Sequence, residues 1–390
     1  MVSINQWYGK HREACKCGAE HYPLVTEKFE IGDEAFSMLR SFLSKKIYKN
    51  VLLVHDKNTW EAAGAKIFAI LSEEGFNVKG SLIPQNSQGD VIADEEAIVH
   101  ALLDADQETE VFIAVGAGTI HDITRFVSFK MGLPFISVPT APSVDGFNSK
   151  GAPIVVKNKK ITFQTHAPIG LFADTKVLCN APQEMLAAGF GDMLGKYTSL
   201  ADWRFGHLTG GEPYCEAAAT MTEEALKNCI KYADLIAEKK EEGIIELMNA
   251  LIKSGLAMSL FGNSHPASGG EHHLSHFWEM RFLEEGRKQL LHGVKVGVSC
   301  ALIADHYKEQ KENLLEASSE TGSMKIEEII AWIPHGSILR ESLKKIGGSA
   351  TLEDIGIEES LFSDSLASAH LIRDRKTMLR HINESKMRTV

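Results

Sequence analysis

The chain has 390 residues, of which 44% are hydrophobic and 24% charged, a composition typical of a globular protein of two or three domains. Its formal net charge of −11 argues against nucleic acid or an anionic membrane surface as the main partner. The N-terminus lacks the apolar segment of a secretory signal, and no apolar run approaches the roughly 18 residues of a membrane span. We therefore expect a cytoplasmic protein with no nucleic-acid or membrane partner.

Predicted strands alternate with predicted helices through the first part of the chain. In chain order these are a helix over 33–50, a strand over 51–56, a helix over 59–76, a strand near 78–84, a helix over 89–106 with Asp90 near its cap, and a strand over 111–116. The strand over 51–56 is a continuous apolar run, as in parallel sheets covered on both faces. This alternation predicts an α/β fold with an N-terminal Rossmann-like parallel sheet.

The strand over 111–116 runs directly into a glycine turn and a helix, GAGTIHDITRF. Gly116 and Gly118 allow the backbone to approach a pyrophosphate, and the free N–H groups of the new helix can hold its charge. His121 stands where the usual fingerprint has its third glycine, and glycines at such turns can be purely conformational. Asp56 ends an earlier strand and could accept hydrogen bonds from a ribose. The stretch is a candidate dinucleotide cradle.

A further apolar strand, PFISVP, leads into a loop rich in Pro, Ser and Gly. Loops at the carboxyl ends of parallel strands bind ligands in such folds, and this loop offers Thr140, Ser143, Asp145 and Ser149. The alternative is simple turn chemistry, in which these side chains bond to the local backbone. Residues 161–174 then have the pattern of a hairpin or strand pair.

After about residue 176 apolar residues recur at helical spacing, with no strand pattern of comparable strength. We expect two domains, an NAD(P)-binding α/β domain over 1–175 and an all-α domain over 176–390 that binds metal and substrate. A cleft between two such domains is a usual place for a substrate.

Histidines cluster in SHPASGGEHHLSHFWEM. If this segment is a helix, His272 and His276 share one face and His273 points elsewhere, while His292 follows a short way on. Asp192, just inside an apparent helix start, is the best candidate for a carboxylate partner. One Asp and two His leave coordination positions open, as in catalytic metal sites. The alternative is a chance cluster in a chain with 16 histidines, with Asp192 as a helix cap.

Six cysteines in so long a chain, Cys215 among them, do not predict a disulfide framework, and we expect reduced thiols. The exception is HREACKCGAEH, where Cys15, Cys17, His11 and His21 could offer soft ligands to a metal. The spacing is not a standard zinc pattern, and polar N-terminal tails are often loosely ordered. An accessory metal site is therefore the lesser alternative there.

Five motifs, GAGTIHD, PTAPSVDGF, GFGDMLGKYTSLADW, PASGGEHHLSH and LHGVKVG, occur in this order. Together they resemble the sn-glycerol-1-phosphate dehydrogenase family, in particular its bacterial AraM-type members, within the group of metal-dependent polyol dehydrogenases and dehydroquinate synthases. The resemblance implies NAD(P)H-linked, metal-dependent reduction of dihydroxyacetone phosphate to sn-glycerol 1-phosphate. It also implies a homodimer and one divalent metal, with nickel favoured and zinc as the alternative. Glycerol or polyol dehydrogenase activity, or a non-catalytic sensor, are the competing hypotheses.

Carried over motif by motif, the resemblance assigns Asp192, His272 and His292 to the metal, and Asp145 and His276 to the substrate. Asp192 would also lie close to the substrate, and Asp192 and His276 would be the catalytic pair, His276 or a water supplying the proton. The cofactor residues would be Asp56, Gly118, Thr119, Ile120, His121, Asp122, Thr140, Ala141, Pro142, Ser143 and Ser149. Asp56 would favour NAD(H) over NADP(H) by repelling a 2′-phosphate.

The substrate phosphate needs positive partners. Arg125, Lys150, Lys196 and Lys295 lie near these motifs in the sequence, and nothing in the sequence selects among them.

Overall fold

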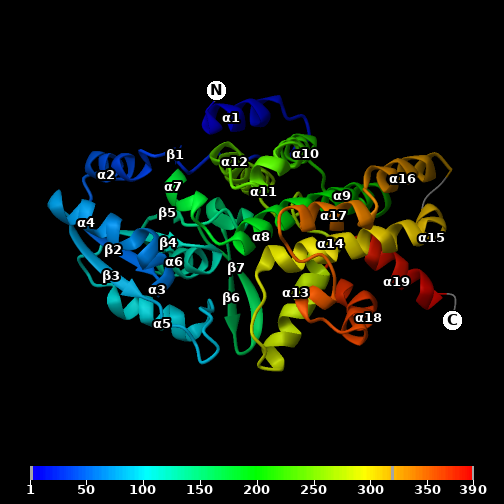
Figure 1. Ribbon diagram of the computed structural model, residues 1–390. Coiled ribbons are helices and arrows are strands. Elements are labelled where there is room, and N and C mark those ends of the chain that lie inside the picture. Colours follow the sequence, from blue (N-terminus) through cyan, green and yellow to red (C-terminus); the bar gives the residue numbers. More distant parts are fainter. Residues whose placement is uncertain (1–2, 318–319, 389–390) are drawn as a thin grey trace.

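The structure, a computed structural model, describes residues 3–317 and 320–388 (Figure 1). Within these ranges a six-stranded sheet has the order β1-β8-β5-β4-β2-β3, and every neighbouring pair is parallel. The strands are β1 (Lys28–Ile31), β2 (Asn50–His55), β3 (Asn77–Leu82), β4 (Val111–Gly116), β5 (Phe135–Pro139) and β8 (Gly170–Ala173). A separate antiparallel hairpin, β6 (Gly151–Val156) and β7 (Lys159–Gln164), follows β5.

Helices cover both faces of this sheet. They are α2 (Ala35–Lys46), α3 (Lys57–Thr59), the π-helix η1 (Trp60–Gly64), α4 (Ala65–Glu73), α5 (Glu95–Asp104) and α6 (Gly118–Met131). Successive strand residues point to opposite faces, so Leu53 of β2 packs with α2 and α4, whereas Leu52 packs with α5 and α6. Burial on both sides explains why β2 and β4 are continuous apolar runs.

The remainder of the chain is helical and lies beside the sheet (Figure 1). Its helices are α7 (Thr175–Cys179), α8 (Gln183–Leu194), α9 (Lys196–Gly210), α10 (Glu216–Lys231), α11 (Ala233–Ala237), α12 (Glu241–Phe261), α13 (Gly270–Glu284), α14 (His292–Glu309), α15 (Lys311–Leu315), α16 (Glu320–Trp332), α17 (Gly336–Lys345), α18 (Glu359–Ser368) and α19 (Met378–Arg388). Three 3-10 turns, η2 (Asp145–Asn148), η3 (Glu353–Ile355) and η4 (Ala369–Leu371), complete the described elements. The expected sheet followed by a helical part is confirmed, whereas a domain boundary at residue 175 stays a prediction.

Helices α8 and α14 approach each other backbone to backbone. A Cβ added to Gly191 would lie 2.4 Å from the carbonyl oxygen of Gly293, and one added to Gly293 would lie 1.8 Å from that of Ala188. No side chain fits in either place. This contact sets Asp192, on α8, beside His292 at the start of α14.

Helix α12 is long and apolar enough to cross a membrane by length and composition, although 61% of that segment is buried inside the protein. Ile244, Met248 and Ile252 are fully buried in a core shared with α10 and with Leu171 of β8. A core helix of a globular protein meets the same criteria, so this finding is weak evidence for a membrane span.

The structure differs from the sequence expectations in three local features. The N-terminal tail forms a helix, α1 (Ile4–Ala14), capped by Ser3 and packed on α10 and α12 of the helical part. Strand β1 was not predicted because its four residues are all half-buried and give no clear pattern. Helix α5 begins with Asp94 as its cap rather than near Asp90, whose carboxylate instead accepts a hydrogen bond from the Gln289 N–H at 3.1 Å.

Candidate active site

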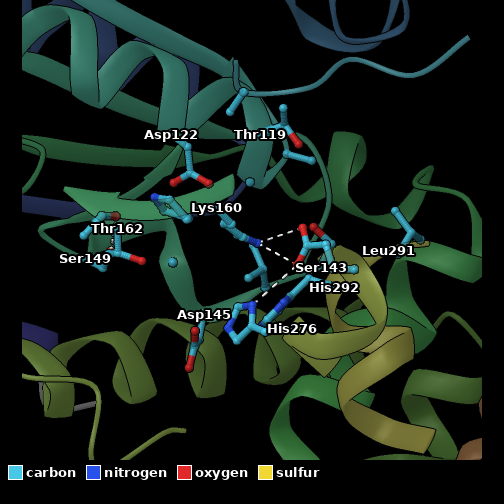
Figure 2. Close-up of a pocket in the computed structure, with 18 of the residues that line it drawn as sticks. Thr119, Asp122, Ser143, Asp145, Ser149, Lys160, Thr162, His276, Leu291 and His292 are labelled. Atoms are coloured by element: carbon cyan, nitrogen blue, oxygen red, sulfur yellow. Dashed lines mark hydrogen bonds and ion pairs between the residues drawn. The ribbon is translucent and has the colours of Figure 1, made fainter. Parts of the chain in front are cut away.

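A cavity of about 1030 Å³ lies at the carboxyl edge of the sheet, where the helical part faces it. The sheet side contributes Asp56 after β2, Gly118 after β4 and Ser143 after β5, and the hairpin contributes Lys160. The helical side contributes residues of α13 and α14. Figure 2 shows His276 and His292 close together on one side of the cavity, with Thr119 and Asp122 across from them.

Asp192, His272 and His292 each offer one ligand atom, and these atoms lie within 4.8 Å of one another. His272 and His292 line the cavity, while Asp192 is fully buried behind them. The Nε2 atom of His272 is 4.0 Å from the Oδ1 atom of Asp192. The ring centroids of His272 and His292 are 5.1 Å apart. The geometry therefore brings together the three residues that the resemblance assigned to a metal, and that role stays a prediction.

The orientation of His272 is fixed from behind. Its Nδ1 atom is 2.7 Å from the Oε1 atom of Glu271, so the Nδ1 proton is donated to this carboxylate and Nε2 faces the cavity. Glu271 is itself fully buried and also accepts hydrogen bonds from Thr198 at 2.6 Å and from the Gly269 N–H at 2.7 Å. A carboxylate behind a ligating imidazole is the usual arrangement in protein metal sites.

Asp192 lies near the end of α8, not at a helix start, because the helix already begins after Pro182. The alternative role as a helix cap is therefore wrong. Its carboxylate accepts from the Asp145 N–H at 2.9 Å and from the Lys196 ammonium at 2.9 Å. The same ammonium is 2.8 Å from the Asp145 carboxylate, which also accepts from Ser254 at 2.8 Å. One buried cation thus holds two carboxylates beside the histidines.

His276 lies on the cavity side of α13, with its ring centroid 5.9 Å from that of His292. Its Nδ1 atom is 3.5 Å from Glu279, a carboxylate that Lys160 approaches at 2.9 Å and Lys295 at 3.4 Å. These two cations hold the pKa of Glu279 well below its usual range despite burial, which opposes them. Burial lowers the pKa of His276 well below the usual histidine value, so its ring is neutral at pH 7.

The predicted cofactor residues divide into two groups. Those that line the cavity are Asp56, Gly118, Thr119, Ile120, Asp122, Ser143 and Ser149. Thr140, Ala141 and Pro142 do not line it, and the side chain of His121 points away from it into the protein. His121 lies 2.7 Å from the Ser137 hydroxyl and 2.9 Å from the Ala117 carbonyl, and burial lowers its pKa to about 3.

Three of the four basic residues considered for the substrate phosphate already pair with carboxylates of the protein. Arg125 is fully buried and donates to Asp122 and to the Gly151 carbonyl. Lys196 is held by the two aspartates, and Lys295 pairs with Glu279. Lys150 lines the cavity as Lys295 does, but its ammonium lies 4.7 Å from the centre of the Tyr22 ring rather than beside a carboxylate of the described residues.

Sequence reasoning missed Arg373, which lines the cavity from the segment before α19. Its guanidinium is 3.3 Å from the hydroxyls of Ser264 and Ser268 and 3.3 Å from Nε2 of His276. In the described part of the chain no carboxylate pairs with it. No motif surrounds this residue in the sequence, so only the fold could reveal it.

Known proteins resemble this chain over nearly its whole length. A glycerol-1-phosphate dehydrogenase (NAD(P)+) of Bacillus licheniformis is 48% identical over 387 residues, covering 98% of this chain and 95% of the relative. The enzyme of the same name from Bacillus subtilis is 45% identical over 95% of this chain and 94% of its own, and that from Pyrococcus furiosus is 32% identical over 84% and 85%. The chain belongs to the glycerol-1-phosphate dehydrogenase family.

The wider relationship agrees with this assignment. Residues 30–182 match the family model for iron-containing alcohol dehydrogenase. The crystal structure of glycerol dehydrogenase from Schizosaccharomyces pombe superposes with a TM-score of 0.67 at 20% identity, covering 92% of this chain and 85% of that one. Maleylacetate reductase from a Rhizobium strain has the same TM-score at 13% identity, covering 95% and 98%. These structures support the fold of this family member.

Proposed function

We infer that this chain reduces dihydroxyacetone phosphate to sn-glycerol 1-phosphate with a nicotinamide nucleotide as hydride donor. The relatives that cover nearly the whole chain carry the name of this activity. The observation that supports it in the structure is one cavity with two kinds of lining. The glycine turn before α6 and Asp56 lie on one side, and the Asp192, His272 and His292 cluster lies on the other.

The cluster fits a divalent metal. An imidazole turned outward by a carboxylate, a second imidazole and a buried carboxylate provide three donors, and the cavity leaves further positions free. Asp192, His272 and His292 would hold the ion, which would act as a Lewis acid toward the substrate carbonyl. Nickel, zinc and iron all suit such donors; we propose nickel on the family resemblance, with zinc as the alternative.

Other residues of the chain would position the groups around that carbonyl. Lys196 fixes both Asp192 and Asp145, so the carboxylates keep their positions when substrate enters. His276 lines the cavity, and its Nε2 atom, the ring nitrogen that does not face Glu279, would take up a proton from solvent and pass it to the substrate oxygen during reduction.

Arg373 is the best candidate for the substrate phosphate. It is a planar double donor, suited to phosphate oxygens, and two serine hydroxyls lie on the same side of the cavity. Binding a phosphate would draw the guanidinium from His276 Nε2, now 3.3 Å away, and free this nitrogen for the substrate oxygen.

Asp56 supports a preference for NADH. It ends β2 at the cavity, and its Oδ1 atom already accepts the Thr59 N–H at 2.8 Å as the cap of α3. A second carboxylate oxygen remains for a ribose hydroxyl and would repel a 2′-phosphate. The homodimer and the cytoplasmic location stay predictions. Light scattering on the purified protein would measure the oligomeric state.

The decisive experiment follows NADH oxidation with dihydroxyacetone phosphate by enzyme stripped with a chelator and reloaded with nickel, zinc or no metal. Metal-dependent turnover is expected, and glycerol with NAD+ should be a far poorer substrate. Equal turnover of glycerol would favour a polyol dehydrogenase, and no turnover with any ion would favour a sensor. The His272→Ala and His292→Ala variants should lose the metal of this cluster and the turnover while they keep their fold.

A further inference from the structure

A second group of metal-ligating side chains lies away from the cavity. Cys15, Cys17, His21 and Cys215 each offer one donor atom, and these atoms lie within 4.8 Å of one another. The first three belong to the segment after α1, and Cys215 begins α10. His11, which the sequence also suggested, does not join them, because its ring nitrogens face the Trp7 carbonyl and Glu224.

The distances are those of four donors around one centre. The Nε2 atom of His21 is 3.0 Å from the sulfur of Cys15, 3.2 Å from that of Cys17 and 3.6 Å from that of Cys215. The sulfurs of Cys15 and Cys215 are 3.5 Å apart. With Zn–S of about 2.3 Å and Zn–N of about 2.0 Å, a tetrahedral site requires about 3.8 Å between sulfurs and about 3.5 Å between sulfur and nitrogen. Small shifts of these side chains would satisfy that geometry.

The surroundings prepare these side chains to bind a metal. Nδ1 of His21 donates to the Leu260 carbonyl at 3.0 Å, which fixes the tautomer that leaves Nε2 free as a ligand. The Cys17 N–H is directed at the Cys15 sulfur, and the Ala218 N–H at the Cys215 sulfur, at 3.5 and 3.4 Å. Such N–H groups, together with the N-terminal end of α10, stabilise thiolates.

We propose that Cys15, Cys17, His21 and Cys215 form a closed structural zinc site that fastens the N-terminal segment to α10 and α12. Three thiolates and one imidazole are a complete set for structural zinc, with no position left for substrate. A disulfide between Cys15 and Cys215 would use only two of the four groups and would not account for the fixed ring of His21.

The position of the site suggests what it does for the enzyme. Tyr22, the next residue after His21, lines the cavity, and its backbone carbonyl accepts from the buried Tyr8 hydroxyl at 2.7 Å. Its ring also lies against Gly262 at the end of α12, where an added Cβ would be 3.2 Å from it. Zinc at this point would therefore fix the chain immediately before Tyr22 and, through it, one wall of the cavity.

The test is metal content of the full-length protein, purified without strong chelators and under reducing conditions. The His272→Ala variant, which lacks the cavity site, should still carry one zinc per chain, and adding Cys17→Ser to it should remove that zinc. Cys179→Ser is the matched control, because Cys179 is also half-buried and lies outside the cluster, and it should keep the metal. Cys215→Ser is a second ligand variant, since serine can still cap α10 in place of the cysteine.

Cobalt provides a readout that does not depend on folding of a ligand variant. Cobalt loaded into the His272→Ala protein should show intense thiolate-to-metal charge transfer in the near ultraviolet and the visible bands of a tetrahedral ion. Removal of zinc should lower the melting temperature by about 3 °C or more. Zinc content independent of Cys17 and Cys215, absence of the cobalt–thiolate bands, or a Cys15–Cys215 disulfide in the protein as purified under reducing conditions would each overturn the proposal.

Discussion

Lys196 offers the sharpest test of how the candidate active site is held together. Its ammonium is fully buried and lies 2.8 Å from Asp145 and 2.9 Å from Asp192, both buried, and it also donates to the Ala267 carbonyl at 3.2 Å. The Lys196→Met variant keeps most of the side-chain volume but removes the charge. Two carboxylates would then face each other in a site of low dielectric without a cation.

Breaking a buried ion pair by removing one partner costs about 3–5 kcal/mol, because the remaining charge is left uncompensated. We expect that loss in the free energy of unfolding of Lys196→Met, measured by urea denaturation of chelator-stripped protein. Stripping matters because a bound cation would take over part of the role of the ammonium. The same substitution at Lys79, whose ion pair with Asp106 is exposed, is the control and should shift the urea midpoint little.

A double variant separates charge from packing. Adding Asp145→Asn to Lys196→Met removes one of the two facing charges, so about 1 kcal/mol or more should be regained relative to the single variant. If Lys196→Met costs less than about 1 kcal/mol, or if the second substitution only adds to the loss, the ammonium is not what holds the carboxylates together.

Three further predictions address the cofactor, the substrate and acid stability. Asp56→Ser, which keeps the cap of α3, should shift the ratio of kcat/KM for NADPH over NADH by roughly tenfold toward NADPH, whereas an unchanged ratio would remove Asp56 from the ribose site. Arg373→Met should raise KM for dihydroxyacetone phosphate by roughly tenfold or more and leave KM for NADH nearly unchanged; a reversed pattern would place the phosphate elsewhere. Burial lowers the pKa of His121 from 6.5 to about 3, so between these values the unfolded chain binds a proton that the folded chain does not. The contribution of neutral His121 to the free energy of unfolding is therefore present above pH 6.5 and is lost as the pH falls toward 3, by up to about 1.4 kcal/mol per pH unit. The urea midpoint of His121→Gln should therefore depend less on pH than that of the unchanged protein.

The sequence predicted those elements whose burial pattern is uniform. The strand over 111–116 was predicted to the residue, because every side chain of β4 is buried and the run is unbroken. Helix α1 was not predicted, because its stability depends on partners far away in the sequence: Tyr8 is buried where α1 packs on α10 and α12. The helix around Asp192 was given the wrong start, and the small residues beside Asp192 lie inside α8, where Gly191 permits the close contact with α14.

The same distinction applies to the site residues. His272 and His276 could be paired from their spacing alone, because one helix turn separates them, and Asp192 was already the candidate carboxylate. The resemblance assigned His292 to the metal in place of His276. Arg373 and Cys215 had no such signal. Cys215 is 194 residues from His21, and only the packing of α1 and its following segment on α10 brings the two together. Pattern reasoning finds groups that share an element and misses those that the fold joins.

The two proposed metal sites differ in a way that matters for any loading experiment. The cavity site has three oxygen and nitrogen donors and open positions, so a chelator can reach its ion directly. The N-terminal site would present three thiolates and an imidazole, two features that favour zinc and slow its removal. Mild stripping should therefore empty the cavity site first and leave the N-terminal segment in place. After mild stripping, activity should return with added nickel while the zinc content stays constant. This result would assign nickel to the cavity site, where the reaction takes place, and zinc to the N-terminal site, which positions Tyr22.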